Sequence, residues 1–362
     1  MSGTPFSVWV FGDAHVGTDR KHERESLATA IRQSERGDEQ GAPAFNWDIA
    51  VDVGDMSGAQ GIPDDEEGRE VRRQLEELRD HSREAIYSVC GNHDRNAPGE
   101  PEARWWRRWI DPLGEHPETS GVDPAARPYP ISGTWERYSF RVGNLLFLMM
   151  SDVNEPTQKH GRGELGGNPG GVVRRETFEW WRSAVAENPD SLIVTVHHYV
   201  LRDTTVASGR WEGVSRTPDG GWKSNYHGYK KLGTPQGASY LYWVGGVADS
   251  TAFQEVLDEY PGRVAFWLAG HTHTNPLDRA GGKSHVETRH GTHFVNAAAL
   301  TRYHVANHAI PMSRLIEFIP GSNLARVRCY LHSDEFAPRG FYAPAERTLT
   351  LSRQFIPPSA SE

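Results

Sequence analysis

The sequence predicts an α/β fold in which short buried strands alternate with amphipathic helices. Three apolar, β-prone runs occupy the first third of the chain, at residues 6–11, 47–53 and 85–90. Two segments with apolar residues at helical spacing, 23–35 and 69–84, separate these runs. Because strands that alternate with helices usually lie parallel in a sheet whose faces are covered, we expect a parallel arrangement here.

The composition limits the classes of function. Hydrophobic residues make up 37% and charged residues 24% of the 362 residues, as in soluble globular proteins. The net charge of −9 argues against a broad binding surface for a nucleic-acid polymer or an anionic membrane. A small phosphorylated substrate remains compatible with this charge, because bound metal ions would invert the local charge.

Three further features predict a cytoplasmic protein. No apolar run approaches the length needed to span a bilayer, and no signal-peptide pattern precedes the first strand. Cys90 and Cys329 are the two cysteines, so the chain can form one disulfide at most and not a disulfide scaffold. These features leave the oligomeric state open.

The middle of the chain is less regular. Residues 95–135, rich in Pro, Gly, Trp and Arg, indicate a long connection with one short helix. Its tryptophans are expected to pack against the body of the protein, with a place at the entrance of the site as the alternative. Gly143-Asn144 between the apolar runs 137–142 and 145–151 predicts a β-hairpin. The glycine-rich segment 158–171 is expected to be a mobile surface loop.

The second half returns to the alternation of helices and strands. Helices are predicted at 176–187 and 250–260, and strands at 191–196, 264–269, 293–299, 313–318, 324–331 and 347–355. Residues 203–246 break this rhythm, and we interpret them as an inserted lid or rim over a site. We therefore expect one domain, 1–356, with insertions at 95–135 and 203–246 and a frayed tail at 357–362.

Five of the predicted strands end in side chains that can bind a metal ion. These are Asp13 and His15, Asp55, Asn92 with His93, His197, and His271 with His273. The carboxyl ends of strands in open α/β sheets meet at one rim, where ligands bind. One such motif alone is usually a turn, but the same pattern at five strand ends favours a shared site. Carboxylates, imidazoles and one amide oxygen, without a thiolate, favour Mn, Fe, Zn, Co or Ni.

With these motifs in place, the sequence resembles the calcineurin-like metallophosphoesterase superfamily. The resemblance rests on an ordered set of motifs: Asp13-x-His15, Gly54-Asp55, Gly91-Asn92-His93-Asp94, His197 and Gly270-His271-x-His273. The set covers most of the chain and is specific for the superfamily, but not for a substrate. It implies a four-layer α/β/β/α sandwich of two mixed β-sheets flanked by helices. The dinuclear metal site of this fold lies at the C-terminal ends of the strands.

The resemblance also implies a set of ligands for two divalent or mixed-valence metal ions of the Mn, Fe, Zn or Co type. Asp13, His15 and His273 would hold one ion, Asn92, His197 and His271 the other, and Asp55 would bridge the two. We assign His197 rather than His198 as the ligand, because the family's ligand is the first histidine after this strand. His93 would act as general acid or as electrostatic stabiliser at the leaving oxygen, with Asp94 fixing the orientation of its ring.

The implied reaction is attack on a phosphate ester by a hydroxide shared between two metal ions. The chain lacks the tyrosine three residues after Asp55 that purple acid phosphatases use for ferric iron. It also lacks the Val-Asp-Arg-Gly run of protein Ser/Thr phosphatases, and its Asn-His motif ends in Asp94 rather than Glu. We therefore predict a phosphodiesterase for a small substrate such as a cyclic nucleotide or a glycerophosphodiester. A phosphomonoesterase or nucleotidase is the alternative, and a non-catalytic metal-binding scaffold is the alternative of another class.

The candidates for substrate contacts extend around this centre. They are His198, Asp152, Trp222, Tyr226 and His227. The aromatic side chains of the 203–246 insertion would stack on a base or cover an alkyl group, unless the insertion is purely structural.

Overall fold

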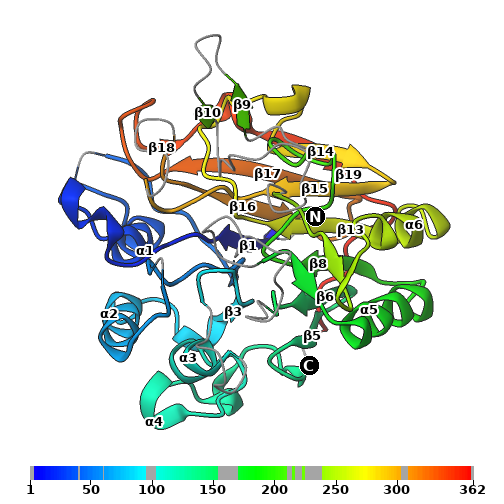
Figure 1. The fold of residues 1–362 in the computed structure, drawn as a ribbon, viewed down its shortest axis with the longest axis horizontal. Helices are drawn as coiled ribbons and strands as arrows, with labels where there is room; N and C mark the ends of the chain where they lie inside the picture. The colour runs from blue at the N-terminus through cyan, green and yellow to red at the C-terminus, as the bar shows by residue number, and fades with distance from the viewer. Residues whose placement is uncertain are drawn as a thin grey trace.

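The computed structural model describes residues 4–39, 41–59, 61–94, 103–153, 170–209, 214–216, 222–224, 239–302 and 309–359. Two seven-stranded mixed sheets form the centre of the fold (Figure 1). The first has the order β18-β17-β16-β1-β2-β3, and β19 also pairs with β17. Its strands are β1 (Phe6–Phe11), β2 (Ile49–Asp52), β3 (Ile86–Ser88), β16 (Met312–Phe318), β17 (Leu324–Leu331), β18 (Gly340–Phe341) and β19 (Arg347–Thr350).

The second sheet has the order β14-β15-β13-β8-β6-β5-β4. Its strands are β4 (Ser132–Gly133), β5 (Arg137–Val142), β6 (Leu145–Met150), β8 (Leu192–Val196), β13 (Val264–Ala269), β14 (Val286–Arg289) and β15 (Thr292–Asn296). Strands β1, β2 and β3 are parallel to one another, as are β6, β8, β13 and β15. The predicted parallel arrangement is confirmed, and it places the carboxyl ends of neighbouring strands at the same edge.

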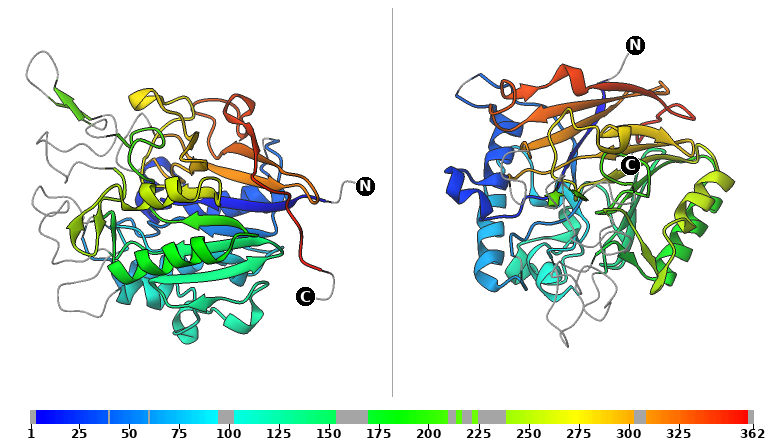
Figure 2. Two further views of the ribbon diagram at one scale, coloured as in Figure 1. Left: turned by 90° about the vertical axis from the view of Figure 1, so that its right-hand side faces the viewer. Right: turned by 45° about the horizontal axis from the view of Figure 1, so that its top comes forward.

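Helices cover both outer faces, which confirms the predicted four layers (Figures 1 and 2). On the first sheet lie α1 (Ser26–Arg36), α2 (Asp65–Leu75) and α3 (Arg104–Trp109), with α4 (Pro117–Ser120) beside α3; on the second lie α5 (Arg175–Glu187) and α6 (Ala252–Glu259). The apolar core between the sheets includes Val8 and Val10 of β1 and Val194 and Val196 of β8. No described helix is long and apolar enough to cross a membrane.

Smaller elements complete the described part of the chain. They are the strands β7 (Val172–Val173), β9 (Val214–Arg216), β10 (Trp222–Ser224), β11 (Trp243–Val244) and β12 (Val247–Ala248), and the 3₁₀-helices η1 (Thr18–His22), η2 (Arg83–Ala85), η3 (Pro124–Ala126), η6 (Ala280–Gly282) and η7 (Ala343–Ala345). Within the predicted insertion 203–246, β9 pairs with β10. Strand β11, near the end of the insertion, pairs with β7 and β12, which lie outside it. Of the predicted loop 158–171, all but residues 170–171 lie outside the described part.

The helix predicted at 69–84 is wrong at both ends. It begins at Asp65, because the side chain of Asp64 accepts hydrogen bonds from the amides of Glu66 and Glu67 and so caps the first turn. It ends at Leu75, and the following residues turn toward β3. The start of α2 matters for the site, since it places Glu67 in the first turn of the helix rather than in the preceding loop.

The connection 95–135 contains two short α-helices among its described residues, where the sequence predicts one. Its four tryptophans are buried against the helical face of the first sheet: Trp105, Trp106, Trp109 and Trp135. The expectation that they pack against the body is thus confirmed. Near the C-terminus, Ile356 O accepts a hydrogen bond from the amide of Asn144 at 3.0 Å, and the amide of Ile356 donates to Asn144 Oδ1 at 2.8 Å. These two bonds fix the backbone of Ile356 to the loop between β5 and β6.

Candidate metal centre

The carboxyl ends of five parallel strands bring most of the predicted polar side chains to one place. Strand β1 leads to Asp13 and His15, β2 to Asp55, β3 to Asn92 and His93, β8 to His198, and β13 to His271 and His273. All eight side chains are buried. Burial of so many ionisable groups is unfavourable unless each is paired or binds a metal ion, so their partners decide what this site can do.

The backbone at four of these positions is in the left-handed region. The φ angles are 49° at Asp13, 36° at His15, 62° at Asp55 and 69° at His271. Such conformations cost roughly 1–3 kcal/mol each for a residue other than glycine. The surrounding sheet therefore holds these turns against a local penalty, as is typical of functional sites.

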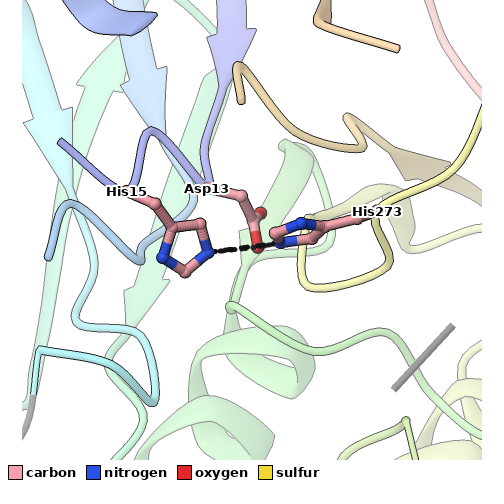
Figure 3. Close-up of side chains that lie close together, drawn as sticks. All are labelled: Asp13, His15 and His273. Atoms are coloured by element: carbon pink, nitrogen blue, oxygen red, sulfur yellow. Dashed lines mark hydrogen bonds and ion pairs between the residues drawn. The ribbon is translucent and has the colours of Figure 1, made fainter. Parts of the chain in front are cut away.

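The first group of donor atoms comes from Asp13, His15 and His273 (Figure 3). The Nε2 atom of His273 lies 3.1 Å from Asp13 Oδ1 and 3.2 Å from His15 Nε2. Asp55 lies beside this group, with Oδ2 3.7 Å from His15 Nε2. These side chains present carboxylates and imidazoles to a common point, which is the set predicted for one metal ion.

The second group consists of Asp55, His198 and His271, with the amide of Asn92 beside it. His198 Nε2 lies 3.2 Å from Asp55 Oδ2, 3.1 Å from Asn92 Oδ1 and 3.3 Å from His271 Nδ1. The same Asp55 oxygen thus faces His15 of the first group and His198 of the second. A carboxylate shared between two donor groups is the arrangement that a bridging ligand requires.

Backbone carbonyls fix the rings of three histidines at this centre. His15 Nδ1 lies 2.8 Å from Ser57 O, His93 Nδ1 2.7 Å from Ala59 O, and His198 Nδ1 2.8 Å from Val53 O. A carbonyl oxygen only accepts, so each Nδ1 carries a proton and each Nε2 is left for the centre. Metal-binding histidines are usually held in this way. The residues present therefore fit two metal ions.

The assignment of His197 as a ligand is wrong, because His198 takes that place. Along β8, Val194 and Val196 face the core between the sheets, and alternation directs His198 to the same side. The Nδ1 atom of His197 instead accepts a hydrogen bond from the amide of Tyr199, 3.0 Å away. Burial and the neighbouring charge of His198 lower the pKa of His197 to about 3. The family's order of motifs pointed to the wrong histidine of the pair, and a difference of one residue changes the side of the strand on which a side chain lies.

Alanine substitutions at the two neighbouring histidines should therefore differ. His198→Ala is expected to lose one of the two metal ions, since it removes a donor of the second group, whereas His197→Ala keeps both. Elemental analysis of the dialysed variants measures the difference, and the melting temperatures show whether each variant is folded. Loss of an ion from a folded His197→Ala, with both retained in His198→Ala, would restore the original assignment.

His93 lies beside His15 of the first group and the shared Asp55. It can offer a ligand atom within 4.8 Å of those of His15 and Asp55. Its ring centroid is 4.6 Å from that of His15, and its amide donates to Asp55 Oδ1 at 2.7 Å. The carbonyl of Ala59, not Asp94, orients the ring. The ring of His93 therefore lies beside His15 of the first group and the shared carboxylate of Asp55.

The prediction that Asp94 orients His93 is wrong. The carboxylate of Asp94 accepts hydrogen bonds from three backbone amides, those of Asp55, Ser57 and Gly91, at 3.0, 2.9 and 2.9 Å. Asp94 thus ties the loop after β3 to the loop after β2. It acts on the centre by holding the backbone at Asp55.

The electrostatics of the centre depend on Asp55. Burial disfavours its charge, but His198, His93 and His15 hold the pKa of Asp55 well below its ordinary value. Burial likewise disfavours the charge of His198, but Asp55 outweighs it and raises the pKa of His198 to about 10. Burial and the charge of Asp55 raise the pKa of Asp94 to about 7. The Asp55 carboxylate needs positive charge beside it, which a bound cation would supply in place of the His198 proton.

The structure describes only some of the side chains predicted to contact the substrate. His198 belongs to the second donor group. Asp152 is buried and accepts a hydrogen bond from the amide of Gly171 at 2.5 Å, so it holds the start of β7. For Trp222 the structure describes the backbone in β10 but not the side chain, and Tyr226 and His227 lie outside the described residues.

Sequence reasoning missed Tyr199. Its hydroxyl donates to Asn92 Oδ1 at 2.9 Å, and its ring packs against that of His271 at a centroid distance of 4.0 Å and an interplanar angle of 33°. The residue is 1% exposed, so it closes one side of the second donor group. An aromatic residue directly after two histidines at a strand end is the signal that could have pointed to it.

The calcineurin-like phosphoesterase family model matches residues 6–275, which include every residue of the two donor groups. The chain belongs to the calcineurin-like phosphoesterase family. Proteins of this family are phosphoesterases that use divalent metal ions. The resemblance seen in the sequence motifs is confirmed.

Solved structures with a related arrangement share little sequence with this chain. One is GAP50, the anchor in the inner membrane complex of Plasmodium, at 9% identity and a TM-score of 0.49, covering 97% of this chain and 90% of that chain. The sulfate thiohydrolase SoxB from Thermus thermophilus has 13% identity and a TM-score of 0.38, and the match covers 93% of this chain and 58% of the SoxB chain. A Vps29 mutant from Entamoeba histolytica has 11% identity and a TM-score of 0.35, and the match covers 96% of this chain and 100% of the Vps29 chain. A comparison with curated proteins found no match.

Proposed function

We propose that this protein hydrolyses a phosphodiester of a small molecule at a centre of two metal ions. The observation that carries the proposal is the position of Asp55 between two groups of buried donors. Asp13, His15 and His273 would hold one ion, and Asn92, His198 and His271 the other. When bound, the two ions would lower the pKa of a water molecule and neutralise charge on the phosphoryl oxygens.

His93 is proposed to assist the leaving oxygen. With Nδ1–H donating to Ala59 O, the second ring nitrogen of a protonated His93 can give its proton to the departing alkoxide. Without proton transfer, the same ring would stabilise the developing negative charge. Its amide also donates to Asp55 Oδ1, so the position of His93 is coupled to that of the shared carboxylate.

The loop after β2 argues against a purple acid phosphatase. The third residue after Asp55 is Gly58, where purple acid phosphatases carry a tyrosine. A Cβ atom built on Gly58 would lie 2.7 Å from Val16 O, so this backbone has no room for a tyrosine side chain. The protein therefore lacks that iron ligand for a steric reason as well as by sequence, which favours the phosphodiesterase-like and nucleotidase-like branches.

A paired assay tests the proposal. The purified protein, loaded in turn with Mn, Zn, Co or Fe, is given a bis-aryl phosphodiester and an aryl phosphomonoester. We expect metal-dependent turnover of both, with the diester faster. A faster monoester would favour the phosphomonoesterase, and no turnover of either ester by the metal-loaded protein would favour the binding scaffold.

Several expectations from the sequence are carried forward as part of the proposal. The substrate is expected to be small, with no nucleic-acid polymer and no membrane as partner, and the protein is expected to be cytoplasmic. The insertion 203–246 is proposed to cover the substrate. A panel of natural phosphate esters, tested with the most active metal, would identify the substrate class.

A further inference from the structure

Residues 57–59, which we call the β2 loop, carry both carbonyl groups that orient His15 and His93. Ser57 O accepts from His15 Nδ1 at 2.8 Å, and Ala59 O accepts from His93 Nδ1 at 2.7 Å. One histidine belongs to a proposed metal site and the other is the proposed acid. The conformation of three consecutive residues therefore fixes the tautomer of two rings with different tasks.

The carboxylate of Glu67 holds this loop. Its Oε1 atom accepts hydrogen bonds from Ser57 Oγ at 3.0 Å, from the amide of Ala59 at 3.1 Å and from the amide of Gly58. Hydrogen bonds to a charged acceptor are roughly twice as strong as neutral ones. Three donors on one oxygen leave the β2 loop little freedom to turn its carbonyl groups away from the rings.

Glu67 is itself fixed by the packing of α2. It lies in the first turn of the helix, which the side chain of Asp64 caps. The carbonyl of Asp64 accepts from Trp105 Nε1 of α3 at 2.6 Å. A Cβ atom built on Gly68 would lie 2.3 Å from the ring of Trp109, so α2 and α3 are in close contact here. The helical layer thus supplies a rigid base for the carboxylate.

We infer that Glu67 is a positioning residue that keeps His15 and His93 protonated on Nδ1, so that both rings present Nε2 to the centre. Its effect on catalysis rests on the proposed function, but its effect on the two rings does not. Partners of this kind typically change metal affinity or activity by about 10- to 100-fold when removed. The expected effect falls on the first donor group, which contains His15, and on His93, but not on the second group.

Nitrogen-15 NMR of the metal-free protein tests the inference on the rings directly. In the wild-type protein, His15 and His93 are expected to be protonated on Nδ1. Glu67→Ala should give a mixture of tautomers at both rings, and Glu67→Gln, which retains an acceptor oxygen, should restore most of the wild-type signal. Glu66→Ala is the matched control, because Glu66 lies exposed in the same turn and loses the same charge.

Calorimetric titration of the same metal-free variants with Mn²⁺ gives a second readout. Glu67→Ala should weaken one of the two binding steps by roughly 10- to 100-fold and leave the other unchanged. Unchanged tautomers in a folded Glu67→Ala would overturn the inference. Equal weakening of both steps together with a lower melting temperature would also overturn it, because that result indicates a purely structural role. If Glu67→Ala does not fold, Glu67→Gln alone tests the inference. Wild-type tautomers together with a weaker Mn²⁺ affinity at one binding step would support the inference. Wild-type tautomers with wild-type Mn²⁺ affinity at both steps would overturn it.

These readouts are separate from the proposed function. A wild-type protein that hydrolyses no ester but shows both rings protonated on Nδ1, with the expected changes in Glu67→Ala, would refute the phosphodiesterase and keep the inference about Glu67. Turnover of the diester with unchanged rings in Glu67→Ala would do the reverse.

Discussion

Asp55→Asn is expected to release both metal ions and to lower turnover by at least about 10³-fold. The reason is that one oxygen of Asp55 faces both donor groups, at 3.7 Å from His15 and 3.2 Å from His198. An amide of the same shape removes the negative charge that both ions would share. Elemental analysis after dialysis gives the metal content, and the diester assay gives the turnover.

The matched control is Asp52→Asn, at the last residue of β2 and three residues before Asp55. Asp52 is fully buried and accepts a hydrogen bond from the amide of Gly54 at 3.0 Å. Burial, reinforced by the charge of Asp94, raises the pKa of Asp52 well above its ordinary value. Asparagine can accept the same bond, and Asp52 belongs to neither donor group, so both ions should remain. Two ions still bound to Asp55→Asn would contradict the bridging role.

The strand ends could be predicted because each apolar run stops abruptly at a polar motif. Asp13, Asp55, Asn92 and His271 each lie two to four residues beyond the end of a buried strand. Parallel pairing brings the first three together at one edge of the first sheet, and the packing of the second sheet against it adds His271 after β13. Local pattern and sheet geometry are enough to identify these positions, and they depend little on the rest of the fold.

The choice of His197 or His198 as the ligand also depends on which face of β8 each side chain lies on. The alternation along β8 places Val194, Val196 and His198 on one side, but reading it requires knowing which face of the sheet meets the other sheet. The family's usual order gave the wrong member of the pair. The packing of the two sheets determines which of the two histidines faces the site, and no local sequence pattern shows how the sheets pack.

Contacts made by backbone groups of loops were out of reach for a similar reason. Nothing in the sequence marks Ala59 as the residue whose carbonyl binds His93, 34 positions away. Glu67 could have been found, since Asp64-x-x-Glu67 is a start signal for a helix. That signal would have moved the start of α2 from 69 to 65 and brought its first turn to the β2 loop.

His93→Ala is expected to keep both metal ions and to lose roughly 10²–10⁴ in turnover. The ligand sets proposed for the two ions are complete without His93, so its loss should leave metal binding intact. What disappears is the group proposed to assist the leaving oxygen. Elemental analysis and the diester assay on the same preparation separate the two effects, and loss of an ion would identify His93 as a ligand instead.

The dependence on the leaving group then distinguishes its two proposed roles. A general acid matters most when the departing alkoxide is a poor leaving group, and little when it is a stable aryl oxide. If His93 donates a proton, His93→Ala should lose far more turnover with an alkyl diester than with a nitrophenyl diester. If its charge acts on the phosphoryl oxygens without proton transfer, both losses should be similar, because the charge on those oxygens develops with either leaving group. Full activity with both diesters would remove His93 from the mechanism.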